Sequence, residues 1–231
     1  NNGQDYSASG MTFQYLPQQV VTSVKPLTGP DSGGTVVTVL GVNFVSSDLI
    51  QCAFGDSAPV RARWLSSGQL ECVTPTHVPG SVSVEVTNNG VDYTSNGVQF
   101  TFDPMPAVLR LEPDTGPLVG ATAVTVHGIH FTRQQSWCRF GVRTVPAMFV
   151  SSTVVKCSSP PHAEGPVAVE VTNNRVDYTS NGVQFFYRRL PLVLSLDPFF
   201  GPDSGGTFVH ITMDNGTEGG DFRHSNTTLC R

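Results

Sequence analysis

Cysteines are the residues of this chain whose chemistry follows most directly from their spacing. Cys52 and Cys72 are 20 positions apart, and Cys138 and Cys157 are 19 positions apart. We predict two disulfide bonds, Cys52–Cys72 and Cys138–Cys157, each closing a loop of about 20 residues. Cys230 is left over, and we expect it to be the first half of a third pair whose partner lies outside this sequence. Because disulfide bonds persist in oxidising compartments, these pairs predict an extracellular or cell-surface protein.

Metal binding is the alternative chemistry for the cysteines and histidines. His77 and His162 each follow a cysteine by five residues, but each would add only a third zinc ligand to its module, and no Cys-x-x-Cys pair is present. His127 and His130 are three residues apart, and residues three apart in a strand face opposite sides. We therefore expect no metal site.

Two further motifs could suggest chemistry, but turns explain them better. Residues 31–34 and 203–206 both read Asp-Ser-Gly-Gly, which resembles the nucleophile region of chymotrypsin-like proteases. Here Pro precedes the Asp, where Gly does so in that family, and no motif supplies the histidine base and buried Asp that catalysis requires. Asp92 and Asp177 each offer one carboxylate in a loop, whereas calcium needs several. We expect turns at these sites, no catalytic residue and no cofactor, and hence a protein that is not an enzyme.

Two N-glycosylation sequons support the extracellular placement. Asn215 begins Asn-Gly-Thr, and Asn226 begins Asn-Thr-Thr. Both fall in the stretch that makes the last part of the chain longer than its counterparts. We therefore predict an N-linked glycan at each Asn.

The elements that position these residues recur, because the sequence repeats with a period of about 86 residues. Residues 84–100 (VEVTNNGVDYTSNGVQF) return as 169–185, and the two segments differ only at Gly90 against Arg175. Residues 1–15 resemble 88–102. The repeat therefore divides the chain into the last strand of a preceding module, module one, module two and the start of module three, at residues 1–19, 20–104, 105–189 and 190–231.

Each module reads as a set of short strands joined by turns. Val82, Val84 and Val86 alternate with polar residues, which is the pattern of a half-buried strand. Such strands spread over about 85 residues predict an all-β protein built from tandem immunoglobulin-like two-sheet sandwiches. The modules are joined by residues 103–106 and 188–191, which are short and contain proline. We therefore expect an extended, semi-rigid rod.

Ordered motifs in each module resemble the IPT/TIG family of immunoglobulin-like domains. Module one carries GPDSGGTVVTVLGVNF at 29–44, CAFG at 52–55 and ECVTP at 71–75, and module two carries the matching GPLVGATAVTVHGIHF, CRFG and KCSSP. Module three begins GPDSGGTFVHIT. The resemblance implies early-set sandwiches, often found in tandem in cell-surface proteins such as plexins. Module two departs from the pattern at Leu118, Val119 and Ala121, so it does not need the Asp-Ser pair.

Three phenylalanines break the repeat and predict a contact surface. Phe186 replaces the outward-facing Thr101 of module one, and Phe199 and Phe200 occupy the slots of Leu27 and Thr28. Apolar groups on an outer face usually mark an interface. We expect all three rings to pack at the joint between modules two and three or against a neighbouring chain, although one of them could instead enlarge the core of its own module.

Composition and charge exclude some of the remaining classes of function. The net charge is −5, and no cationic cluster extends beyond Arg188 and Arg189, so we expect no nucleic-acid partner. No apolar run is long enough to span a bilayer. The main prediction is a non-catalytic structural or adhesive repeat protein, such as a stalk, filament or matrix component. A plexin-like receptor stalk is the first alternative, and an accessory module of a carbohydrate-active enzyme is the second. The expected partners are adjacent modules, other copies of the protein or cell-surface partners.

Overall fold

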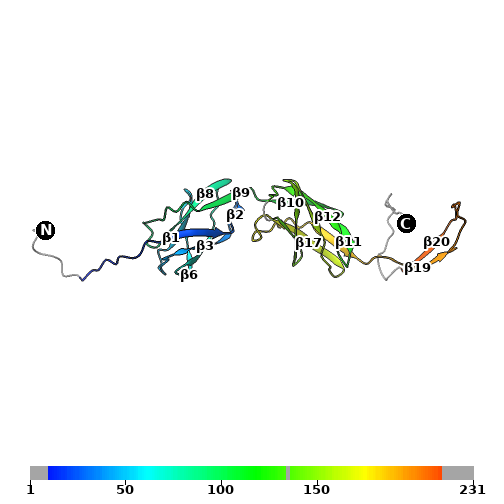
Figure 1. Cartoon of the computed structure of the whole chain (residues 1–231), viewed down its shortest axis with the longest axis horizontal. Coiled ribbons are helices and arrows are strands. Elements are labelled where there is room, and N and C mark those ends of the chain that lie inside the picture. Colours follow the sequence, from blue (N-terminus) through cyan, green and yellow to red (C-terminus); the bar gives the residue numbers. More distant parts are fainter. Residues whose placement is uncertain (1–9, 134–135, 215–231) are drawn as a thin grey trace, which may run out of the picture.

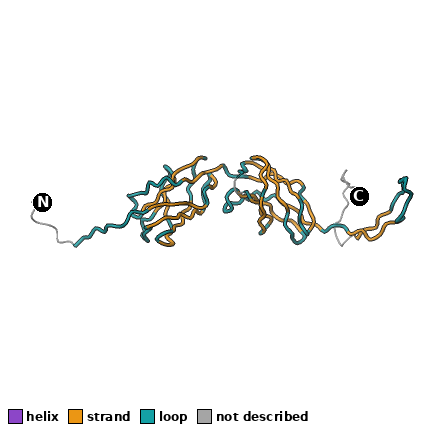
Figure 2. Tube along the Cα trace, in the orientation of Figure 1, coloured by secondary structure: helices purple, strands orange, loops and turns teal. Residues whose placement is uncertain are grey.

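A computed structural model describes residues 10–133 and 136–214 of the chain. The described residues contain twenty β-strands and no helix. Figure 1 shows two sandwiches in succession along an extended chain, followed by a two-stranded hairpin. Figure 2 shows that the connections between strands are loops and turns. The all-β fold of tandem immunoglobulin-like modules predicted from the sequence is confirmed.

Module one is built from nine strands that form two sheets. The first sheet has the order β1-β3-β7-β6, and the second has the order β2-β9-β8-β4-β5. The strands are β1 (Val20–Lys25), β2 (Thr28–Pro30), β3 (Val36–Val42), β4 (Gln51–Phe54), β5 (Val60–Arg61), β6 (Arg63–Ser66), β7 (Gln69–Val73), β8 (Gly80–Thr87) and β9 (Gln99–Asp103).

Module two repeats this arrangement strand for strand. Its sheets have the orders β10-β12-β16-β15 and β11-β18-β17-β13-β14. The strands are β10 (Ala107–Glu112), β11 (Thr115–Pro117), β12 (Ala123–Ile129), β13 (Trp137–Phe140), β14 (Arg143–Pro146), β15 (Met148–Ser151), β16 (Val154–Ser158), β17 (Gly165–Thr172) and β18 (Gln184–Arg188).

Alternating side chains build the core between the two sheets of each module. Val37 and Val39 of β3 are fully buried, as are Val84 and Val86 of β8 on the opposite sheet. Period-two burial of this kind is what a pleated strand with one covered face requires. Aromatic rings in edge-to-face contact lie within each core, and the core of module two is built from equivalent positions, with Tyr187 in place of Phe102. Each module therefore carries its own hydrophobic core.

The start of module three is a hairpin of β19 (Leu192–Asp197) and β20 (His210–Asp214). Its register shifts between Val193 and Ser195. The pairing of β1 with β3 shifts at the equivalent place, between Val21 and Ser23. The hairpin therefore repeats the first two paired strands of a module.

Candidate functional site

The structure joins the two predicted cysteine pairs. Cys52 on β4 is bonded to Cys72 on β7, and Cys138 on β13 is bonded to Cys157 on β16. In both cases the Cα atoms are 6.4 Å apart, within the usual range for a disulfide. Each bond links one sheet of its module to the other, through the buried core. The disulfides therefore act as covalent ties between the sheets.

The joint between the modules is made by one loop of module two, residues 173–177, which we call the joint loop. The Asn174 side-chain amide donates a hydrogen bond to the main-chain oxygen of Thr28 at 2.9 Å. The Thr35 hydroxyl donates to the Asp177 carboxylate at 2.7 Å. Both threonines belong to module one, and Thr35 is fully buried. Two polar contacts, one of them charge-assisted, therefore cross the joint.

The sequence of the joint loop sets its shape before it meets module one. The Asn174 side-chain oxygen accepts hydrogen bonds from the main-chain N–H groups of Val176, at 2.9 Å, and Asp177, at 2.8 Å. Its amide donates to the Asp177 carboxylate at 2.6 Å. Asn favours such turns because its short side chain can bond to nearby backbone. The loop is thus held in one conformation by its own residues.

The linker between the modules is fixed at the same place. A ring nitrogen of His130 lies 2.9 Å from the main-chain oxygen of Met105. Pro106 is buried, and Asp103 at the end of β9 is half-buried. This burial raises the pKa of the Asp103 carboxyl above its ordinary value. The conformational freedom of the linker is therefore restricted by its short length, its two prolines and a side-chain contact.

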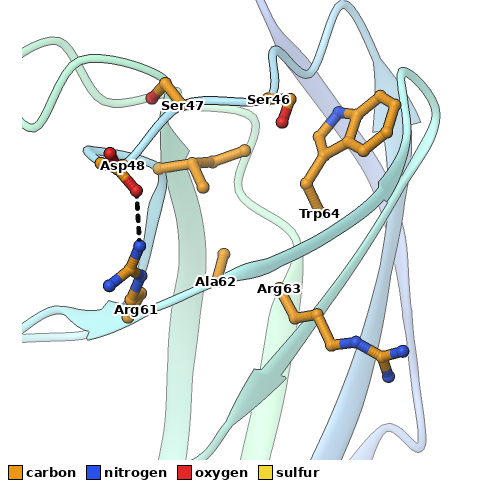
Figure 3. Close-up of a pocket in the computed structure, with 8 residues that line it drawn as sticks. Ser46, Ser47, Asp48, Arg61, Ala62, Arg63 and Trp64 are labelled. Atoms are coloured by element: carbon orange, nitrogen blue, oxygen red, sulfur yellow. Dashed lines mark hydrogen bonds and ion pairs between the residues drawn. The ribbon is translucent and has the colours of Figure 1, made fainter.

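A second surface feature lies on module one, away from the joint. Figure 3 shows an open hollow beside Trp64, in which Asp48 and Arg61 form an ion pair at 2.7 Å. Arg63 points away from the hollow and pairs with Glu71 at 2.7 Å. The charged groups of this hollow thus already have partners within the module. The hollow is therefore weaker evidence for a ligand site than the joint is for a contact between modules.

The histidines that could have bound metal have other roles in the structure. His77 stacks on Phe102, with ring centroids 4.8 Å apart, and His162 stacks on Tyr187 at 5.0 Å. His127 lies 3.5 Å from Glu112. Among the described residues, no group of three or more potential ligands converges. His77 and His162 therefore cover the aromatic end of their own modules.

The Asp-Ser-Gly-Gly motif of module one forms a turn. The Gly33 N–H donates to the main-chain oxygen of Pro30 at 2.9 Å, and Gly33 has a positive φ of 73°. The Asp31 N–H donates to the main-chain oxygen of Asp103, which ties the turn to the end of β9. The motif thus lies beside the joint, and its role is to form a turn through main-chain hydrogen bonds.

The structure corrects where two of the three repeat-breaking phenylalanines lie. Phe199 and Phe200 follow β19, so a strand of about 20 Å separates them from the linker to module two. Of their counterparts in module one, Leu27 and Thr28, the second contacts the next module at the joint. The predicted place at the joint between modules two and three is therefore wrong for this pair, which lies at the far end of the hairpin.

The exposure of the three rings differs. Phe199 and Phe200 are 81% and 73% exposed, and their ring centroids are 5.0 Å apart. Phe186 is half-buried on β18, where its main chain pairs with Thr115 of β11. Contact of these rings with a neighbouring chain stays a prediction.

Three predicted sites lie outside the described residues, namely Cys230, Asn215 and Asn226. Their disulfide and glycans stay predictions. Conversely, the sequence did not single out Asn174, Asp177 and Thr35 as contact residues. The available signal was the repeated Asn-Asn-x-Val-Asp stretch, but a turn alone explains that stretch within a module.

Two serial sandwiches, a disulfide across each core and a polar joint between them define a tandem immunoglobulin-like module protein. The IPT/TIG domain family matches residues 20–102 and 106–187. The chain belongs to the IPT/TIG domain family. The resemblance stated from its motifs is thereby confirmed.

Curated relatives and a solved structure agree with this assignment. The chain is 26% identical over 208 residues to plexin A3 of Danio rerio and 30% identical over 217 residues to plexin-A2 of Mus musculus. Each match covers 84% of this chain but only 11% of the relative, so the chain spans about a tenth of their length. The full extracellular region of plexin A4 superposes with a TM-score of 0.53 at 22% identity, covering 78% of this chain and 17% of that one.

Location follows from the covalent structure and the relatives together. Disulfide bonds persist in oxidising compartments, and each module contains one. The similarity to plexins agrees with that environment. The protein is extracellular or exposed at the cell surface. Within the described residues, no helix could cross a membrane.

Proposed function

We propose that this chain is a non-catalytic part of a receptor ectodomain of plexin type, in which it serves as a semi-rigid stalk. The observation that carries this proposal is the joint, where Asn174 and Asp177 bind Thr28 and Thr35 across the modules. A stalk must keep a fixed direction between its ends, and a bonded joint with a proline-containing linker does this. The similarity to plexins favours a receptor over a filament, a matrix component or an enzyme's accessory module.

The joint predicts a loss of rigidity in the Asp177→Ala variant. The carboxylate accepts the Thr35 hydroxyl and the Asn174 amide, so its removal leaves a buried hydroxyl without this partner. A hydrogen bond to a charged group contributes about 1.5–3 kcal/mol, which is enough to change the population of the docked state more than tenfold. Small-angle X-ray scattering should show a narrow range of intermodule distances in the wild type and a broad range in Asp177→Ala.

The matched control is Asp92→Ala, which breaks the same contact within the equivalent loop of module one. In the 231-residue chain, Asp92 makes no described contact with module two, so this variant of the chain should scatter like the wild type. A broad distance range in the wild type itself would contradict the stalk proposal. Loss of rigidity in both variants would show that the effect is not specific to the joint.

The receptor assignment itself predicts that the natural full-length chain is anchored in the plasma membrane. A membrane-impermeant amine reagent should label it on intact cells, because Lys25 is exposed in module one. The labelled chain should then be extracted with detergent along with other membrane proteins. Recovery mainly from deposited matrix or from the medium would instead support the structural filament or matrix component.

A further inference from the structure

Module one carries its own copy of the joint loop, at residues 88–92. Its internal bonds match those of the joint loop, because the Asn89 amide donates to the Asp92 carboxylate at 2.7 Å. The Asn89 side-chain oxygen accepts the N–H groups of Val91, at 3.0 Å, and Asp92, at 2.9 Å. The loop lies where the chain enters module one, since the Gln19 side chain donates to the main-chain oxygen of Asp92 at 2.8 Å. It is therefore built like the joint loop and faces the preceding part of the chain.

The two loops differ in what covers them. Asn174 of the joint loop is 7% exposed, and Asp177 is half-buried. Their counterparts Asn89 and Asp92 are both exposed. The loops differ in sequence only at Gly90 against Arg175, and Arg175 stacks on Trp137 of its own module. Since the internal bonds are the same, the difference in burial comes from module one, which the joint loop contacts. Module one therefore presents a preformed contact surface whose partner is absent from the described residues.

The chain enters both modules by the same route. Asn43 and His130 occupy equivalent positions with positive φ values of 62° and 58°. The Asn43 side chain donates to the main-chain oxygen of Gln18 at 2.8 Å, as the His130 ring contacts the main-chain oxygen of Met105 at 2.9 Å. The segment before module one is thus held like the linker before module two. A module placed ahead of it would meet residues 88–92 as module one meets the joint loop.

The other half of the contact also recurs in an uncovered form. In module one, Gly29 and Pro30 beside the joint are buried, and so is Thr35. In module two, the equivalent Gly116 and Thr122 are only half-buried. Modules one and two therefore each have a loop at the entry end and a threonine at the exit end. In the described residues, the loop and the threonine are buried at the joint between these modules and are more exposed at the other two ends.

We propose that residues 88–92 of module one form a docking surface for the exit end of an IPT/TIG module that precedes it in the same chain. Asn89 would donate to a main-chain carbonyl of that module, and Asp92 would accept from a threonine hydroxyl, as in the observed joint. Residues 1–15 resemble the final turn and strand of such a module. Head-to-tail contacts of this kind extend without closing, which suits a stalk. The inference rests on the proposed stalk function in one respect, namely that the natural chain contains further modules in tandem.

Hydrogen–deuterium exchange tests this proposal in the natural full-length ectodomain and in the 231-residue chain. The amides of Val91 and Asp92 report on the loop, because both donate to Asn89. We expect them to exchange about tenfold slower in the full ectodomain, the factor given by one or two net hydrogen bonds. The amides of Val176 and Asp177 should be equally protected in both proteins and serve as the internal reference.

The Asp92→Ala variant, measured in both proteins, separates docking from simple loosening of the loop. Loosening of the loop would speed exchange in each, but the difference between the two proteins should disappear. The control Asp56→Ala removes an exposed carboxylate beyond the end of β4 that lies away from this loop, so it should keep the difference. Equal exchange of the wild-type loop in both proteins would overturn the proposal. Protection of the 231-residue chain that grows with its concentration would overturn it too, because a second copy would then be the occupant. Either result would leave the rigidity of the observed joint, and hence the stalk proposal, unaffected.

Discussion

Replacing Cys52 and Cys72 together by Ala is expected to lower the free energy of unfolding of module one by about 3 kcal/mol. The bond closes a loop with a sequence separation of 20, and a cross-link of this length restricts the unfolded chain by about that amount. It is also the covalent tie between the two sheets. For a module of this size, calorimetry should show the corresponding transition roughly 12–24 °C lower.

The second disulfide supplies the matched control. Replacing Cys138 and Cys157 by Ala should shift the transition of module two instead, because that bond has nearly the same separation, 19. Non-reducing peptide mapping of the wild type should first recover both pairs. A Cys52–Cys138 linkage, or an unchanged melting profile for both double variants, would contradict the assignment of one stabilising bond to each module.

The sandwich of each module could be predicted from local patterns, because those patterns are dictated by which face of a strand is covered. Val37 and Val39 alternate with outward residues, as do Val84 and Val86, and the structure buries all four. The cysteine pairs were predictable for a related reason. Equivalent residues of a repeated core must meet in the same way in both copies, so matched spacing implies matched bonding.

The contacts at the joint could not be predicted in the same way. The sequence of the loop does not determine whether the loop contacts another module. Asn89 and Asn174 have nearly the same neighbours in sequence, yet within the residues that the structure describes only Asn174 binds another module. What differs is the position of each module in the chain. The role of His130 was missed for a similar reason, since its partner is a main-chain oxygen of the linker, which no side-chain motif reveals.

Phe199 and Phe200 show the opposite error, in which closeness in sequence was taken for closeness in space. Both follow the linker to module two by only a few residues, but those residues form the extended strand β19. An extended strand advances about 3.3 Å per residue, so the six residues of β19 carry the chain about 20 Å from the linker. A residue at the end of the first strand therefore belongs to the next joint.

Truncating a central aromatic ring is expected to have the largest effect of any single substitution in module one. Phe100 is fully buried on β9, and its ring contacts Phe54 and Phe102 edge-to-face at centroid distances of 5.7 and 5.0 Å. Phe100→Ala would remove these contacts and leave a cavity between the sheets. Such changes cost about 3–5 kcal/mol, a large part of the stability of a domain of this size. Urea unfolding followed by tryptophan fluorescence should show the loss, because Trp64 reports on this module.

The control for this prediction is Phe199→Ala, because that ring is 81% exposed in the chain. Truncation of an exposed side chain away from a packed surface changes stability by no more than about 0.5 kcal/mol. Because both variants replace Phe by Ala, the difference between their changes in the free energy of unfolding measures the effect of burial. If Phe199→Ala destabilised the chain as much as Phe100→Ala, the exposed hairpin would have to be covered by a partner in solution, and the core of module one would not be the main source of its stability. A small effect of Phe100→Ala would instead mean that the two sheets can close over the missing ring, which the fully buried side chains and the disulfide beside it argue against.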